Sequence, residues 1–164
     1  QADKGVRKLA DGSFHVAVLR PPMIYGKGSK GNYPLLAKMA KKLPVFPDIR
    51  NERSMLYIGN LCEFLCLLMK SGKGGIYFPQ NAEYVRTSDM VRQIAKTAGH
   101  RIWITKLLNP VVWVASRIPG KVSGMVNKAF GNMVYEMSMS QAFEGNYRCF
   151  NLEGSINLTE GKVK

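Results

Sequence analysis

Apolar positions along the chain fall into two patterns, short continuous runs and longer segments with helical spacing. The short runs are rich in β-branched and aromatic residues and predict strands at 14–19, 45–46, 54–58, 76–78 and 102–104. Apolar residues that recur every three or four positions predict helices at 1–10, 32–43, 60–69, 87–98, 109–118 and 121–130. Strands that alternate with helices indicate an α/β fold with a few short strands and several helices.

Two of these helices allow a prediction of the face that packs on the core. In the helix at 32–43 we expect the buried stripe to be Leu35, Leu36, Met39 and Ala40, with the lysines outward. In the helix at 87–98 we expect Met90, Val91, Ile94 and Ala95 to face inward. The sequence Thr87-Ser88-Asp89 is typical of a helix cap, and Asn32 has the same potential for its helix.

We expect the rest of the chain to be arranged around residues 16–26. We expect 16–19 to be a fully buried strand, which ends at Arg20 because Pro21 and Pro22 lack an N–H and fix φ. The glycines at 26, 28 and 31 then predict a sharply turning loop. Ligands of open α/β sheets bind outside the carboxyl ends of the strands, so this loop is the predicted ligand-binding edge.

The net charge of the chain indicates which kinds of molecule it can bind. The chain of 164 residues carries 24 Lys and Arg against 11 Asp and Glu, a formal charge of +13. Such a domain attracts nucleic acid, anionic membranes or phosphorylated small molecules. Lysines 27, 30, 38, 41 and 42 gather around the predicted loop, where they either form a solvated face or steer an anion inward.

The cysteine and hydropathy patterns argue against a metal-binding protein and against a membrane-spanning protein. Cys62 and Cys66 lie one helical turn apart on an apolar segment, without further ligands at metal-binding spacing, so we expect buried free thiols in a reducing cytoplasm and no metal site. The longest apolar runs, 61–69 and 107–118, are shorter than the about 20 residues that span a bilayer, and we do not expect a membrane as partner.

Several of these segments resemble a known family. Residues 19–26 (LRPPMIYG) are similar to the segment after the sixth strand of NAD-dependent sugar epimerases and dehydratases, the extended short-chain dehydrogenases. Residues 53–61 (RSMLYIGNL) resemble the arginine, short strand and helix further along that family. Residues 74–78 and 87–91 match the strand and capped helix that follow. Order and spacing agree over residues 1–99, and more loosely to the end.

The resemblance implies the C-terminal portion of such an enzyme, with the N-terminal Rossmann half missing. Residues 1–26 then form a remnant of the NAD-binding half, and residues 27–164 form the part that binds a nucleotide sugar. Ala2-Asp3 stands where the family has an Ala-Glu pair just beyond its catalytic Tyr-x-x-x-Lys. No G-x-G-x-x-G fingerprint directly follows the first predicted strand, 14–19, either, because Arg20, Pro21 and Pro22 come next. We therefore expect no catalytic residue in this chain, and no activity from it alone.

The resemblance also assigns residues near the cofactor and the diphosphate. Pro21, Pro22 and Met23 match the loop beside the nicotinamide, and NAD itself would be bound mainly by the N-terminal half. Arg53 matches an arginine directed at the substrate diphosphate, a task suited to a guanidinium fork. Several 4-epimerases have Asn where this chain has Met23. The family's second substrate arginine has no clear match, with Lys128 and Arg148 as candidates.

Other positions match residues that contact the nucleotide. Asn32 and Tyr33 open the helix whose start contacts the nucleotide in the family, where main-chain N–H groups favour an anion. Val45 and Phe46 match a short strand beside the base, although Phe46 also suits a core position. The predicted substrate-binding set is thus Asn32, Tyr33, Val45, Phe46 and Arg53.

The resemblance implies the substrate-binding part of a cytoplasmic, homodimeric, NAD-dependent nucleotide-sugar 4-epimerase of the UDP-galactose/UDP-glucose type. The family reaction is transient oxidation to a keto sugar followed by return of the hydride. Two alternatives stay open. A steroid-type or flavonoid-type reductase of the same superfamily would use the apolar segment 109–118, with Trp113, to line its substrate site. A basic nucleic-acid-binding module is the other, although helix-turn-helix, zinc-finger and RNP motifs are missing.

Overall fold

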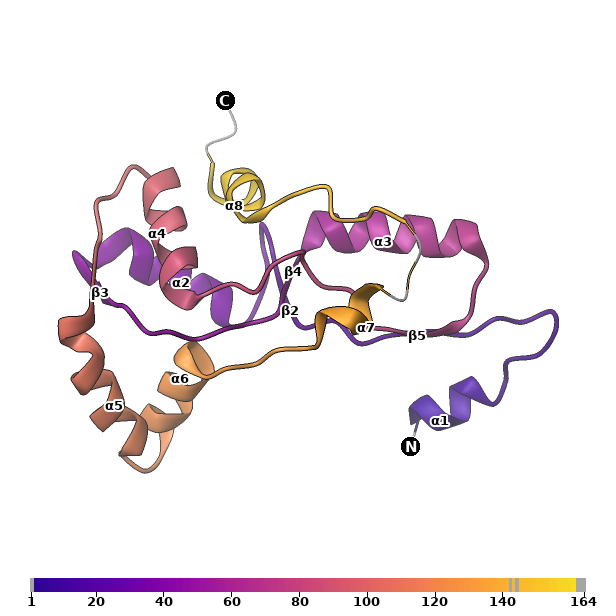
Figure 1. Ribbon diagram of the computed structural model, residues 1–164, viewed down its shortest axis with the longest axis horizontal. Helices are drawn as coiled ribbons and strands as arrows, with labels where there is room; N and C mark the ends of the chain where they lie inside the picture. The colour runs from indigo at the N-terminus through magenta and orange to yellow at the C-terminus, as the bar shows by residue number, and fades with distance from the viewer. Residues whose placement is uncertain (1, 142, 144, 162–164) are drawn as a thin grey trace.

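The structure is a computed structural model that describes residues 2–141, 143 and 145–161, so Gln1 of the predicted first helix lies outside the described residues. The molecule is elongated, with α1 and β1 at one end and α5 and α6 at the other (Figure 1). Its elements are α1 (Ala2–Arg7), β1 (Ala17–Leu19), β2 (Met23–Tyr25), α2 (Asn32–Lys42), β3 (Val45–Pro47), β4 (Met55–Tyr57), α3 (Ile58–Ser71), β5 (Gly75–Tyr77), α4 (Thr87–Thr97), β6 (Trp103–Thr105), a 3₁₀ turn η1 (Lys106–Leu108), α5 (Asn109–Arg117), α6 (Lys121–Phe130), α7 (Met137–Gln141) and α8 (Leu152–Glu160).

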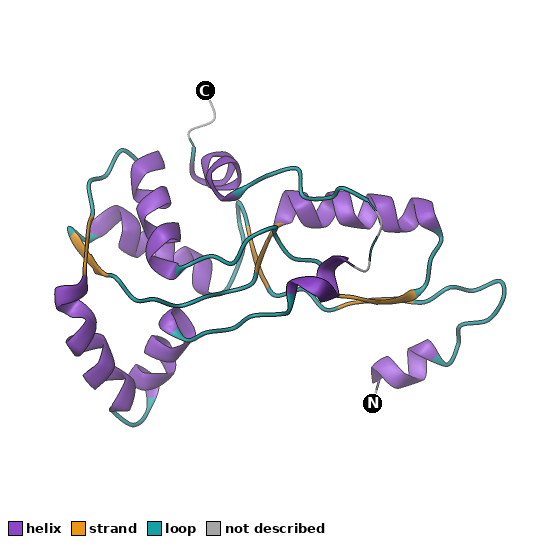
Figure 2. Ribbon diagram, in the orientation of Figure 1, coloured by secondary structure: helices purple, strands orange, loops and turns teal. Residues whose placement is uncertain are grey.

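The strands form three parallel pairs spaced along the molecule (Figure 2). β1 pairs with β5, β2 with β4, and β3 with β6. Each pair is joined by a connection that contains helix, as parallel pairing requires. The fold is therefore α/β with a few short parallel strands and several helices, as the sequence predicts.

β4 lies at the centre of the packing, with all three residues buried. Met55 and Tyr57 belong to the main core, which draws on β2, β3, α2, α4 and α8. Leu56 points to the opposite face, where it joins a second core around Phe64 of α3 and Tyr147. A strand alternates its side chains between two faces, so one short apolar run serves both cores.

The stretch 16–26 differs from the prediction in two ways. The strand begins at Ala17 and is not fully buried: Ala17 is exposed, and Val18 and Leu19 are half-buried. In the described part of the chain, β1 pairs with β5 alone, which covers one edge only. Met23 lies in a strand rather than in a loop. Pro22 directly precedes this strand and so removes no ladder hydrogen bond.

Three other predictions are corrected. Leu35 is 42% exposed, and the buried stripe of α2 consists of Tyr33, Leu36, Ala37 and Ala40. The helix caps are Gly31 and Arg86, without a side-chain capping bond, instead of Asn32 and Thr87 to Asp89. Cys62 and Cys66 are free, as expected, but exposed, because they lie on the outer side of α3. The inward stripe predicted for α4 is confirmed.

Two further features of the structure bear on the class of protein. Across the described residues, the structure holds no helix with the length and hydropathy to cross a bilayer. The same residues contain no group of three or more His, Cys, Asp or Glu arranged to hold a metal ion.

Candidate functional site

Arg53 is buried at the start of β4. Its backbone exchanges hydrogen bonds with Val85, at 3.1 and 2.9 Å. Its side chain is folded inward, where Nη1 donates to the carbonyl oxygens of Lys128 at 2.6 Å and Gly131 at 3.3 Å. These carbonyls lie at the C-terminal end of α6, the negative end of the helix dipole. Burial lowers the pKa of the Arg53 guanidinium.

Asn32 reaches the same place from α2. Its Nδ2 donates to the Lys128 carbonyl at 3.5 Å, the acceptor that Arg53 also uses. The structure thus brings together two of the predicted substrate residues from separate elements. Lys128 itself, a candidate for the second diphosphate contact, takes part here through its backbone.

The predicted strand residues approach the same helix end. Phe46 of β3 is fully buried, and its ring centroid lies 5.6 Å from that of Phe130, the last residue of α6. Val45 is half-buried beside it. Asn32, Phe46 and Arg53, on α2, β3 and before β4, therefore all contact residues 128–131.

Tyr33 points elsewhere. Its ring stacks on Tyr25 at 5.6 Å, and its hydroxyl donates to Oε1 of Glu160 at 2.9 Å. Burial and the Glu160 carboxylate raise the pKa of the Tyr33 phenol. Tyr33 lines a cavity of about 400 Å³ between the glycine loop and α2, where Lys41 forms an ion pair with Glu160 at 2.5 Å. The structure does not bring Tyr33 to Arg53.

The Pro-Pro segment connects the carboxyl end of β1 to the amino end of β2. Pro21 and Pro22 are half-buried, and Met23 packs against the main core. Met23 pairs in register with Met55, two residues beyond Arg53. The segment therefore lies at the same end of the β2–β4 pair as Arg53.

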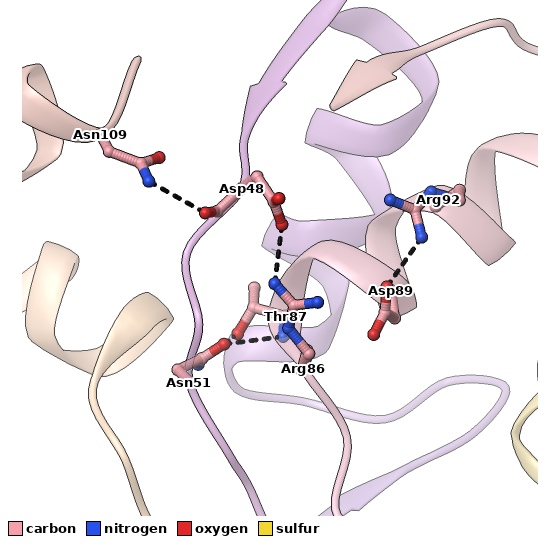
Figure 3. Close-up of polar contacts among 7 residues, drawn as sticks. All are labelled: Asp48, Asn51, Arg86, Thr87, Asp89, Arg92 and Asn109. Atoms are coloured by element: carbon pink, nitrogen blue, oxygen red, sulfur yellow. Dashed lines mark hydrogen bonds and ion pairs between the residues drawn. The ribbon is translucent and has the colours of Figure 1, made fainter. Parts of the chain in front are cut away.

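A polar network fixes the loop that carries Arg53 (Figure 3). Asp48 accepts a bond from Arg86 Nη2 at 2.7 Å through Oδ1, and one from Asn109 Nδ2 at 3.0 Å through its backbone oxygen. Asn51 donates to Thr87 Oγ1 at 2.9 Å and accepts from the Thr87 N–H at 3.0 Å. Loop 48–54 is thus held to the start of α4 and to α5.

Beside this network lies a cavity of about 450 Å³, lined by Arg50, Asn51, Glu52, Arg86 and Asn132. The Nε of Arg86 is buried and has no hydrogen-bond partner among the described residues. The sequence analysis did not single out Arg50, Asn51 or Arg86. Two arginines three residues apart, at 50 and 53, are the signal that points to this loop.

Arg148, the other candidate for a second diphosphate contact, lies in a neighbouring part of the molecule. Its Nε donates to the Gln80 carbonyl at 3.1 Å, and its Nη2 donates to Ser140 Oγ at 2.5 Å. The Gln80 side chain in turn accepts a bond from Ser54 Oγ at 2.6 Å. Arg148 is thus connected to the residue after Arg53 through Gln80.

Comparison with known proteins shows which enzymes the chain resembles. No family model matches the chain. UDP-glucose 4-epimerase of Vibrio cholerae is 27% identical to it over 147 residues, which are 84% of this chain and 44% of that protein. The chain resembles the C-terminal part of the NAD-dependent epimerases. It thus spans less than half the length of this curated relative.

Solved structures share the fold. The UDP-glucose 4-epimerase of Thermus thermophilus in complex with NAD matches 99% of this chain and 51% of its own, with a TM-score of 0.60 and 17% identity. The Bordetella bronchiseptica enzyme WbmG in complex with NAD and UDP matches 96% of this chain and 45% of its own, with a TM-score of 0.62 and 14% identity. The human epimerase family protein SDR39U1 with NADPH matches 96% of this chain and 52% of its own, with a TM-score of 0.65 and 12% identity.

Proposed function

We propose that this chain is the substrate-binding part of an NAD-dependent nucleotide-sugar epimerase, of the UDP-galactose/UDP-glucose 4-epimerase type. The observation that carries the proposal is the setting of Arg53. Residue Arg53 is 4% exposed, and the partners of its side chain among the described residues are carbonyl oxygens rather than a carboxylate. A buried cation without a counter-ion favours an anionic ligand, such as a diphosphate.

The proposed roles follow from this arrangement. Both side-chain bonds of Arg53 come from Nη1, and a guanidinium has five N–H donors, so the fork retains capacity for phosphate oxygens. Asn32, bonded to the same Lys128 carbonyl, would contact the nucleotide beside it. Val45 and Phe46 would border the base. Tyr33 would support α2 through its bond to Glu160.

The residues of this chain fit one edge of NAD. Pro21 and Pro22 present a rigid backbone at the carboxyl end of β1, and Met23 continues into β2 beside the site. When bound, NAD supplies a hydride acceptor that oxidises a sugar hydroxyl and then returns the hydride. The one G-x-G-x-x-G spacing of this sequence, at 26–31, follows β2 rather than the first strand, so we propose that other residues of the enzyme bind most of the cofactor.

A ligand panel tests the proposal against its alternatives. The melting temperature of the chain should rise with UDP-glucose and with UDP, because a ligand that binds the folded state alone stabilises it. It should not rise with a steroid, a flavonoid or random-sequence DNA. A rise with the steroid or flavonoid alone would favour the reductase. DNA binding with a steep salt dependence and no response to UDP would favour the nucleic-acid module.

The cytoplasm is the compartment that we propose for the protein. All three cysteines are free and exposed in the structure. Exposed free thiols suit a reducing compartment.

A further inference from the structure

Helix α5 has an unusual surface. None of its nine residues is buried. Leu107, just before the helix, and Val111, Val114 and Ile118 follow one another at helical spacing and are 47% to 78% exposed. They form an outward stripe, while Val112 and Ala115 are half-buried on another side. A helix that is apolar on several sides is typical of a protein core or a membrane, and this one is at the surface.

Both tryptophans of the chain lie in the same region. Trp103 of β6 and Trp113 of α5 are 66% and 59% exposed. The guanidinium carbon of Arg117 lies 3.5 Å from the centroid of the Trp113 ring, a cation–π contact at the end of the helix. Tryptophan combined with a long basic side chain is the composition found where a protein meets the headgroups of a bilayer.

The charge of this region has one sign. Residues 90–135 contain seven Lys and Arg and no Asp or Glu. Arg101, Lys106 and Arg117 are exposed around the apolar stripe. Positive charge around an apolar stripe is complementary to an anionic lipid surface. The same charge opposes self-association through this stripe, because two copies would bring like charges together.

The position of the region leaves it accessible. α5 and α6 pack against each other in a hairpin at one end of the long axis, and α1, where the chain enters, lies at the opposite end (Figure 1).

We propose that the docking stripe, formed by Leu107, Val111, Val114, Ile118 and the two tryptophans, binds the surface of an anionic phospholipid membrane. At 1.5 Å per residue the nine residues of α5 extend about 14 Å, too short to cross a bilayer, so the helix lies in the plane of the interface. The apolar side chains enter the acyl boundary while Arg101, Lys106 and Arg117 contact lipid phosphates. The expectation of no membrane partner rests on the length of the apolar runs alone, a criterion that applies to a membrane span and not to this surface binding. The surface is also distinct from the nucleotide site.

Vesicle binding by the 164-residue chain tests this proposal. Vesicles of phosphatidylcholine and phosphatidylglycerol should co-sediment the protein, and vesicles of phosphatidylcholine alone should not. The emission of Trp103 and Trp113, the only tryptophans, should shift to shorter wavelength on binding, because both enter a less polar environment. Added salt should weaken the binding.

Matched variants identify the surface. The triple variant Leu107→Ser, Val111→Ser, Val114→Ser should reduce vesicle partitioning at least about tenfold. The control Leu35→Ser, Met69→Ser, Leu158→Ser changes three leucine or methionine residues of similar exposure on α2, α3 and α8, and should bind as the unchanged chain does. If the triple variant does not fold, the pair Lys106→Glu, Arg117→Glu, which leaves all six side chains of the stripe in the sequence, should lower binding to anionic vesicles several-fold.

Three results would overturn the proposal. The first is no binding to anionic vesicles. The second is an equal loss of binding in the control variant. The third is a dimer in sedimentation that the triple variant abolishes, without vesicle binding, which would assign the stripe to a second copy of the chain.

Discussion

At the scale of single residues, Arg53 is the residue on which the proposed function depends most. Lysine in its place keeps the charge but loses the planar fork that binds two oxygens at once. We predict that Arg53→Lys weakens UDP-glucose binding about tenfold or more, measured by calorimetry. Arg101→Lys, at an exposed arginine two residues before β6, is the control and should leave the affinity unchanged. Equal affinities of the two variants would remove Arg53 from the site.

Two buried phenols make the stability of the fold sensitive to alkali. Burial raises the pKa of Tyr25, and burial together with Glu160 raises that of Tyr33, from a usual value of 10.0. Above pH 10 the unfolded chain therefore releases these protons while the folded chain retains them, so folding stability falls as the pH rises. Urea unfolding between about pH 8 and pH 11 should show this decline.

Tyr33→Phe isolates the contribution of one phenol. The variant should show a shallower alkaline decline, because phenylalanine has no proton to release in either state. Tyr84→Phe, which removes a phenol that donates to the Tyr135 carbonyl at 2.8 Å, serves as control. An unchanged slope in Tyr33→Phe would contradict the account of its environment.

At the scale of elements, the tether of loop 48–54 to α4 holds Arg53 in place. Asn51→Ala removes two hydrogen bonds to Thr87 and leaves the buried N–H of that residue unpaired. We expect a loss of about 2–4 kcal/mol of unfolding free energy in urea titrations. Asn146→Ala, at an exposed asparagine, should stay within about 0.5 kcal/mol. Similar losses of unfolding free energy in Asn51→Ala and Asn146→Ala would mean that the hydrogen bonds between loop 48–54 and α4 contribute little to stability.

Element prediction succeeded where one local pattern decides the structure. The predicted range of α6 matches the observed one, and the inward residues of α4 are those expected, since apolar positions there occupy a single face. In α2 apolar residues occupy several faces. The stack on Tyr25 and the long-range bond to Glu160 turn Tyr33 inward, and Leu35 lies outward. Helix α8 was not predicted, although Asn151 is a local signal for its start. The Asn151 side chain accepts a hydrogen bond from the Gly154 N–H.

The site was predictable in part for the same reason. The resemblance assigned Asn32, Phe46 and Arg53, but their common neighbour, the end of α6, comes from a segment about 75 residues after Arg53 in the chain. Neither periodicity nor motif spacing gives such a contact. The cavity beside Arg86 depends on the same long-range packing.

At the scale of the whole molecule, we propose that the chain forms the substrate-binding side of the enzyme. In its sequence no tyrosine is followed four residues later by a lysine, so the Tyr-x-x-x-Lys pattern that the resemblance implies for catalysis is absent from these 164 residues. We predict no detectable interconversion of UDP-glucose and UDP-galactose by this chain with added NAD, measured by a coupled assay. Turnover would show that its own residues supply the catalytic proton transfer.

Hydrogen–deuterium exchange with and without UDP-glucose tests the central claim most directly. The account predicts that the ligand slows amide exchange in residues 46–54 and 128–132, where Phe46, Arg53 and the end of α6 meet. It predicts no change in the docking stripe of the hairpin. Exchange that stays the same in both segments at saturating UDP-glucose would contradict a nucleotide-sugar site at Arg53.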